Sequence, residues 1–197
     1  ASSDVREAMD VDRECPQPTL CFVFADNQNH IGLQGTGRFP KRPTCGLGLA
    51  PLPAWDSSNH WDGFLSSSFL PNIYNPPEGF VATANEGWNP PEGPLLVTQL
   101  LPDYRKRRID ERLAEINKAT VEDMQQLQYD VVSVHARDML PTLLPHLPDC
   151  EIKHRLAQWD YVFDTNSKEA VWFQRLYINL IIEIFGHEKA IGWRRII

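Results

Sequence analysis

The sequence lacks several features that would identify a class of function at once. It has no apolar run of the roughly 18 residues that a membrane-spanning helix needs. Its longest apolar cluster, residues 176–185, is interrupted by Asn179 and Glu183. Basic residues are scarce, because 19 Lys and Arg stand against 26 Asp and Glu for a net charge of -7. Nucleic-acid binding needs a concentrated basic surface. We therefore expect neither a membrane span nor a nucleic-acid partner.

Cysteine is rare, and its four copies follow no metal-binding pattern. They are Cys15, Cys21, Cys45 and Cys150. We expect buried free thiols, with a disulfide between Cys15 and Cys21 as the alternative in an exported protein. A Ser-His-Asp triad stays open, since its members need not be adjacent in sequence. The G-x-S-x-G turn that often presents such a serine is missing, however.

The chain is rich in proline, with 16 residues against 11 glycines. The prolines cluster between residues 40 and 102, which predicts irregular chain ordered by buried aromatic side chains such as Trp55 and Trp61. A length of 197 residues suits one domain with a substantial core. We expect residues 1–197 to form a single domain or a fragment of a larger enzyme. Residues 1–103 should hold strands and long loops, and residues 104–197 should be mainly helical.

The first half of the chain predicts antiparallel strands. Residues 19–25 are rich in aromatic and β-branched side chains, and residues 31–37 return after a polar turn. Asn29 suits this turn, because asparagine tolerates positive φ better than most residues. A further strand is expected over residues 79–85, ending on the side chain of Asn85.

The second half predicts three helices. Apolar residues recur at helical spacing over residues 107–118, 124–136 and 171–185. Thr120 and Asp123 predict a capping box before the second helix, which should be bounded by Pro141 and Pro145. Asn166 and Glu169 should open the third helix, and Gly186 suits its C-cap. A short helix is also expected around residues 5–9. Apolar residues nearly encircle the third helix, so it should be buried on several sides. Strands and helices together predict an α+β domain.

Two motifs carry the strongest indication of function. Residues 75–85 read Asn-Pro-Pro-Glu-Gly-Phe-Val-Ala-Thr-Ala-Asn, and residues 104–110 read Tyr-Arg-Lys-Arg-Arg-Ile-Asp. Together they resemble the penicillin acylase family of N-terminal-nucleophile amidohydrolases, in which N-P-P-x-G-(F/Y)-(I/V)-x-(T/S)-A-N is followed by Y-R-x-x-R-I. Further matches lie in the first hairpin at Phe22, Ala25, Asp26, Ile31, Gly32, Gly37, Pro40 and Arg42. The chain departs from the family at Asn29 and His30, where Gly-Asn is favoured.

The resemblance implies an αββα core that hydrolyses linear amides after autocatalytic removal of a linker. The family nucleophile is the first residue of the β-chain, usually Ser, and its own α-amine acts as the base. No residue here matches it, because Ser2 follows Ala1 and precedes a helix-like segment. We therefore expect a central segment of the β-chain that is inactive alone. Its partners would be the α-chain, the N-terminal part of the β-chain and a small-molecule amide.

Asn85 is the first candidate catalytic residue, because it matches the family asparagine that stabilises the oxyanion. A fixed N–H donor at a developing oxyanion contributes about 3 kcal/mol. The alternative is that Asn85 only caps a turn. The flanking motif favours the oxyanion role.

Arg105 is the second candidate, because it matches a family arginine beside the catalytic centre. A guanidinium offers five donors in a rigid fork and stays charged. The alternative is a solvated arginine in the first turn of a helix, where the helix dipole disfavours positive charge. Arg108 is expected to form a salt bridge within the fold. Gln128 and Ser133 match a helical Q-x-D-x-x-S pattern of the family, and we expect them to be structural.

No cofactor is assigned. Some family members bind calcium, and calcium binding by the full-length protein is left as an alternative. Glu86, Glu92 and Asp103 form no dense acidic cluster, however. The resemblance alone suggests a periplasmic or secreted location, and it selects no substrate among penicillins, cephalosporins and acyl-homoserine lactones. The alternative function is a non-catalytic binding or assembly module on the same scaffold.

Overall fold

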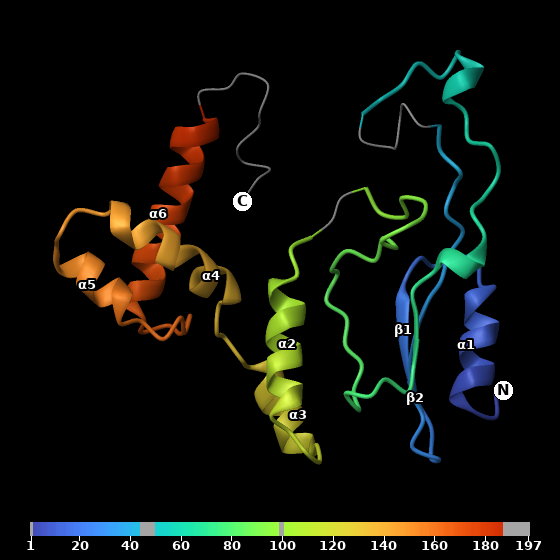
Figure 1. Ribbon diagram of the computed structural model, residues 1–197, viewed down its shortest axis with the longest axis horizontal. Coiled ribbons are helices and arrows are strands. Elements are labelled where there is room, and N and C mark those ends of the chain that lie inside the picture. Colours follow the sequence, from blue (N-terminus) through green and yellow to red (C-terminus); the bar gives the residue numbers. More distant parts are fainter. Residues whose placement is uncertain (1, 44–49, 99–100, 187–197) are drawn as a thin grey trace. The chain divides into compact units, whose positions relative to one another are not determined.

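The computed structural model describes residues 2–43, 50–98 and 101–186 (Figure 1). The chain divides into two compact units, residues 1–115 and residues 116–197. Helix α2 (Tyr104–Ala114) belongs to the first unit, whereas the sequence pattern groups it with the helical half. Among the described residues, no helix combines the length and the apolar character that crossing a membrane requires.

A three-stranded antiparallel sheet organises the first unit. Its strands are β1 (Cys21–Ala25), β2 (Ile31–Gly35) and β3 (Asn72–Tyr74), in the order β1-β2-β3. Leu33 in the central strand pairs with a residue on either side, Val23 and Ile73, and its side chain is fully buried. The predicted hairpin is therefore confirmed.

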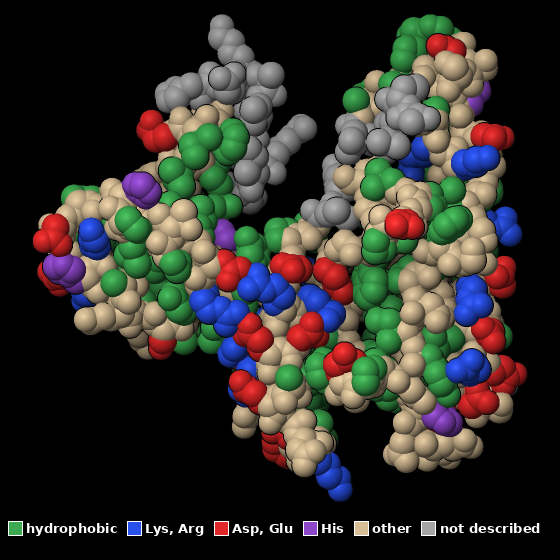
Figure 2. All heavy atoms as spheres, in the orientation of Figure 1, with side chains coloured by type: hydrophobic (Ala, Val, Ile, Leu, Met, Phe, Trp, Pro, Cys, Tyr) green, Lys and Arg blue, Asp and Glu red, His purple; other side chains and the backbone are tan. Residues whose placement is uncertain are grey.

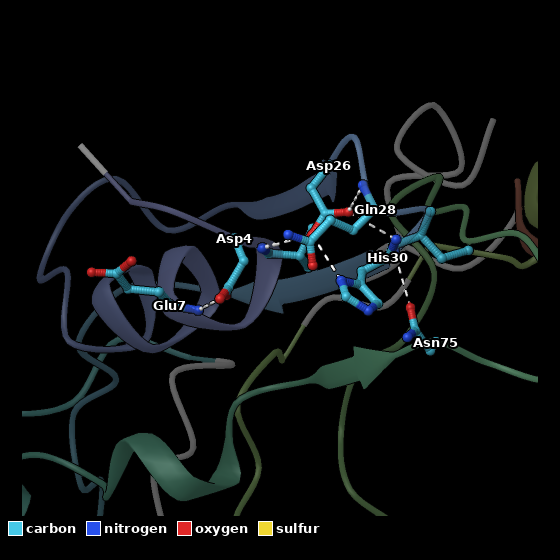
Figure 3. A network of polar contacts seen from close by, with 8 residues as sticks. Asp4, Glu7, Asp26, Gln28, His30 and Asn75 are labelled. Carbon is cyan, nitrogen blue, oxygen red and sulfur yellow. Dashed lines mark hydrogen bonds and ion pairs between the residues drawn. The ribbon is translucent and has the colours of Figure 1, made fainter.

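The turn between β1 and β2 is fixed by one carboxylate. Asn29 takes the predicted positive φ, at 67°. Asp26 accepts hydrogen bonds from the backbone of Gln28 at 2.8 Å and of His30 at 2.9 Å, and its other oxygen lies 2.9 Å from Nδ1 of His30. That oxygen also accepts the N–H of Val5 at 3.3 Å. Figure 3 shows Asp26 beside Gln28 and His30 in this turn. One side chain therefore joins the turn to the first helix.

Helix α1 (Val5–Arg13) covers one face of the sheet. Asp4 caps it by accepting the N–H of Glu7 at 2.8 Å (Figure 3). Val5 and Met9 are buried against Gly32 of β2, where an added Cβ would collide with both side chains. The helix can approach the sheet this closely because residue 32 is glycine.

The strand predicted over residues 79–85 is absent, and this stretch is irregular chain. Gly79 and Asn85, at its two ends, have φ of 77° and 64°. Residues 72–74 pair with β2 instead, and no described strand pairs with residues 79–85. An alternating side-chain pattern forms a strand only where a neighbour supplies the hydrogen-bonded ladder.

The long proline-rich segment contains two short 3₁₀ helices, η1 (Ser57–Asn59) and η2 (Ser67–Phe69). The prediction that buried aromatic residues order it is wrong for both tryptophans. Trp55 is 89% exposed and Trp61 is 64% exposed. Leu70, just after η2, is the buried side chain that anchors this end of the segment.

The second unit is helical. It comprises α3 (Val121–Gln128), α4 (Val134–Leu143), the 3₁₀ helix η3 (Leu144–His146), α5 (Glu151–Ala157) and α6 (Lys168–Phe185). Its core is formed by Ala136, Leu140, Leu156, Trp159, Ala170 and Phe173. The predicted capping box at Thr120 is confirmed at the start of α3.

The helix predicted over residues 124–136 is two helices, α3 and α4. Ser133 interrupts the pattern, because its hydroxyl accepts the N–H of Ala136 and so begins α4. Val132, just before it, pairs with Val162 in an isolated β-bridge. Pro141 lies inside α4 rather than at its boundary.

The remaining helices also differ in detail from the prediction. Ser167, not Asn166, caps α6, and Gly186 is its C-cap as predicted. Helix α5 was not predicted. Helix α6 buries Phe173 and Ile181 but leaves Val171 59% exposed and Ile184 55% exposed. The expected burial on several sides is therefore not present within the described part of this unit.

Three cysteines, Cys15, Cys21 and Cys150, lie in described residues and are free thiols. Cys15 and Cys21 are half-buried, whereas Cys150 is exposed, against the expectation of burial. Cys45 lies outside the described residues.

Candidate active site

A cavity of about 550 Å³ lies within the first unit. Loop residues Thr83 to Glu86 line it together with Arg105 and Ile109 of α2. Leu20 and Cys21, at the start of β1, and apolar residues of the neighbouring loops complete the wall. Both predicted site residues, Asn85 and Arg105, therefore face one space.

Asn85 presents its carboxamide at the edge of this cavity. Its backbone adopts φ of 64°, a conformation that asparagine tolerates, and its side chain is exposed. Its Oδ1 accepts a hydrogen bond from Nη2 of Arg105 at 2.9 Å. Among the described residues no acceptor takes a hydrogen bond from its Nδ2. The acceptor end of the amide is held while the donor end is available.

Arg105 fixes the loop through two hydrogen bonds from one nitrogen. Its Nη2 donates to the carbonyl of Ala84 at 2.7 Å and to Oδ1 of Asn85 at 2.9 Å. The guanidinium only donates, so its bond also identifies which end of the Asn85 amide is the oxygen. The side chain comes from the first turn of α2, which places a fixed positive charge beside the amide.

The other charges of α2 are paired along the helix. Figure 2 shows side chains of both signs gathered over it. The ion pairs include Lys106 with Asp110, Arg108 with Glu111, Arg112 with Glu115, and Arg107 with Asp103 just before the helix. The salt bridge expected of Arg108 is confirmed, at 3.3 Å.

Glu86 is a site residue that the sequence reasoning missed. Its Oε2 accepts the N–H of Ala84 at 2.6 Å and the hydroxyl of Thr83 at 3.2 Å. Trp88 Nε1 donates to the same hydroxyl at 3.2 Å, which extends the network along the loop. The other carboxylate oxygen of Glu86, Oε1, is buried and has no hydrogen-bond partner in the described structure. From the sequence, Glu86 was considered only as a possible calcium ligand. Its position directly after Asn85 was the feature that could have identified it as a site residue.

Cys21 also lines the cavity. Burial raises the pKa of its thiol, and the negative charge of Glu86 raises it further. The thiol is therefore protonated at neutral pH and is a poor nucleophile there.

Asn89 holds the far side of the loop in place. Its Oδ1 accepts the N–H groups of Leu96 and Val97 at 2.8 Å and 2.9 Å, and its Nδ2 donates to the carbonyl of Val97 at 2.9 Å. These three bonds close the loop and place Leu96 in the cavity wall.

The remaining candidates have local roles. Ser133 caps α4, which agrees with the structural role expected of it. Gln128 is exposed at the end of α3, and no side-chain contact in the described structure gives it the structural role expected of it. His30 pairs with Asp26 at the hairpin turn. The residues that the structure describes contain no group of three His, Cys, Asp or Glu side chains arranged to hold a metal ion.

Comparison with known proteins gives consistent matches. A model of the family described as penicillin amidase matches residues 1–196. The acyl-homoserine lactone acylase QuiP of Pseudomonas syringae pv. tomato is 30% identical, over 98% of this chain and 26% of that protein. Penicillin acylase 2 proenzyme of Pseudomonas sp. (strain SE83) is 31% identical, over 87% of this chain and 23% of that protein.

The fold is also matched by a solved structure. The thermostable penicillin G acylase from Alcaligenes faecalis gives a TM-score of 0.73 at 18% identity, over 98% of this chain and 37% of that chain. At this identity the likeness shows the fold alone, and it confirms the predicted α+β class. The chain spans about a quarter of the length of the curated relatives it matches.

Proposed function

This chain belongs to the penicillin amidase family, and we propose that it supplies part of the active site of a hydrolase that cleaves linear amide bonds. The observation that carries the proposal is the Asn85 carboxamide. Its oxygen is held by Arg105 and its N–H groups are left to donate beside a cavity. Such an arrangement suits a donor to an oxyanion.

In the proposed reaction an N-terminal Ser outside the 197 residues attacks the carbonyl carbon of the amide. The α-amine of that serine takes the hydroxyl proton as the C–O bond forms. The carbonyl oxygen becomes an oxyanion and accepts a hydrogen bond from Nδ2 of Asn85. When the C–N bond breaks, the proton passes to the leaving amine. Water then hydrolyses the acyl-enzyme by the same steps.

Arg105 contributes as a positioning residue. Its positive charge on Oδ1 polarises the Asn85 amide and so strengthens the N–H groups at the other end as donors. Its second bond, to the carbonyl of Ala84, fixes the backbone from which Asn85 projects. A donor held in place before the reaction does not have to reorganise as charge develops.

The substrate in this proposal is a small-molecule amide, and the partners are the remaining segments of the same enzyme. Two relatives are named for acyl-homoserine lactones and penicillins. The described residues do not favour either of these two substrate classes. A periplasmic or secreted location belongs to the same proposal, since it too derives from the family.

The test is Asn85→Ala in the full-length, matured enzyme, assayed with phenylacetyl and long-chain acyl p-nitroanilides. Loss of one oxyanion donor should lower kcat by roughly 100- to 1000-fold. Asn117→Ala, at an exposed position in the second unit, is the matched control and should keep full activity. Turnover by the Asn85 variant at the rate of the parent would exclude the oxyanion role. A full-length protein that cleaves no amide would favour a binding or assembly module instead.

A further inference from the structure

Only one of the two carboxylate oxygens of Glu86 accepts hydrogen bonds within the described structure. Two donors from the loop, the N–H of Ala84 and the hydroxyl of Thr83, bind Oε2 and fix the side chain. Oε1 is buried and accepts no hydrogen bond from the described residues. A buried acceptor without a donor is costly, so proteins rarely keep one unless another group supplies the donor.

The position of Glu86 indicates where that donor comes from. Glu86 lines the same cavity as Asn85, one residue away along the chain. The other titratable side chains that line the cavity within the described structure are Cys21 and Arg105. Neither of them donates to Oε1, which has no hydrogen-bond partner in the described structure. Cys21 is a neutral thiol, and Nη2 of Arg105 is bonded to Ala84 and Asn85.

We infer that Glu86 holds an ammonium group in the cavity beside Asn85, an inference that rests on the proposed amidase function. A protonated amine supplies both the missing donor and the opposite charge. Hydrogen bonds in which both partners are charged are shorter and stronger than neutral ones. The anchored Oε2 keeps the carboxylate in place, so Oε1 needs no further ordering to accept a hydrogen bond.

The ammonium can come from two sources with the same chemistry. One is the α-amine of the N-terminal nucleophile, whose protonated form a nearby carboxylate stabilises. Its pKa would then be raised, and the free amine that acts as base would be reached only at higher pH. The other source is the substrate, if its acyl part carries an α-amino group next to the reacting carbonyl.

The test uses Glu86→Gln in the full-length, matured enzyme, because glutamine keeps the shape and an oxygen for the N–H of Ala84 but removes the charge. Glu92→Gln, at an exposed carboxylate of the same loop region, is the matched control. The substrates are phenylacetyl p-nitroanilide and phenylglycyl p-nitroanilide, which differ by one ammonium group. The pH profile of kcat/KM is measured for both.

Two results would support the inference and identify the source. If Glu86 holds the enzyme's own amine, the acid limb of kcat/KM moves down by about one pH unit with both substrates. If it holds the substrate, kcat/KM for the phenylglycyl amide falls about tenfold relative to the phenylacetyl amide. Glu86→Asp, which keeps the charge but retracts it by one methylene, should change either quantity less, and it carries the test if the glutamine variant does not mature.

Calorimetric binding of phenylglycinamide and phenylacetamide to the same proteins reads the ammonium preference without turnover. An unchanged acid limb, an unchanged ratio between the two substrates and equal binding would overturn the inference. The Asn85→Ala variant tests the proposed function separately. An inactive Asn85 variant beside unaltered Glu86 profiles would leave that function standing and exclude the ammonium site.

Discussion

The Asn85–Arg105 pair shows how a proposed oxyanion donor can be assembled from two elements. A loop supplies the amide, and the first turn of α2 supplies the group that holds its oxygen. Both residues were predicted as candidates from two motifs about 20 residues apart. Their mutual hydrogen bond was not predicted, because sequence does not show which way a carboxamide is turned.

Replacing Arg105 should therefore impair turnover more than binding. In the full-length enzyme, Arg105→Ala removes both bonds from Nη2 and lets the Asn85 amide rotate. Misplacement of a catalytic group by about 1 Å can cost about a hundredfold in rate, so we expect kcat to fall by roughly this factor with KM little changed. Steady-state kinetics measure both constants. Arg107→Ala on the same helix is the control, and equal kcat values for the two variants would contradict the positioning role.

Asp26 should make the hairpin turn sensitive to strong acid. Partial burial alone would raise its pKa, but hydrogen bonds from His30, Gln28 and Val5 outweigh this and lower the pKa to about 2. A carboxylate with a lowered pKa stabilises the fold above its unfolded pKa, near 4, and this contribution is lost as pH falls toward 2.

The corresponding variant is Asp26→Asn. It should lower the thermal midpoint at pH 7, and the difference from the parent should shrink steadily from about pH 4 to pH 2. Thermal unfolding followed by circular dichroism across this range measures it. Asp62→Asn, at an almost fully exposed carboxylate, should show no such trend. A constant difference at every pH would mean that the charge of Asp26 is not involved.

At the scale of elements, prediction succeeded where the determining contacts are local. The hairpin of β1 and β2 and the capping box at Thr120 depend on neighbours a few residues away. The strand over residues 79–85 failed because its pattern says nothing about whether a partner strand is present. The break between α3 and α4 was missed because Ser133 sits within an apolar repeat that continues on both sides.

The cap at Ser133 is open to a direct test. Ser133→Ala removes the acceptor for the N–H of Ala136 and should lower the free energy of unfolding by about 1 kcal/mol. Ser133→Thr keeps a hydroxyl and should restore most of the loss. Denaturant titration of both variants measures the difference. Equal midpoints for the alanine variant and the parent would show that the cap is unimportant.

At the scale of the whole molecule, the chain consists of two compact units and covers about a quarter of its curated relatives. The site described here contains a proposed oxyanion donor and its positioning residue but no assigned nucleophile. The resemblance to the family predicted this, since its motifs left the family nucleophile unmatched.

We therefore expect the 197-residue chain alone to hydrolyse no amide. Attack on the carbonyl requires the serine and its α-amine, which the proposal assigns to another segment. The measurement is a p-nitroanilide assay of the purified chain beside the full-length enzyme at equal molar concentration. Inactivity should persist at high chain concentration, and any turnover that Asn85→Ala abolishes would show that the nucleophile lies within these residues.

Because the backbone at Asn85 is left-handed, the residues that the loop can accept at this position differ from those that the proposed reaction can use. Glycine would occupy this conformation at no steric cost, and aspartate would accept it more readily than alanine. In a library randomised at this codon, the glycine and aspartate variants should therefore be produced well. Their clones should not grow when an amide that the enzyme must hydrolyse is the nutrient. Only the clones with asparagine should both accumulate the protein and grow on the amide.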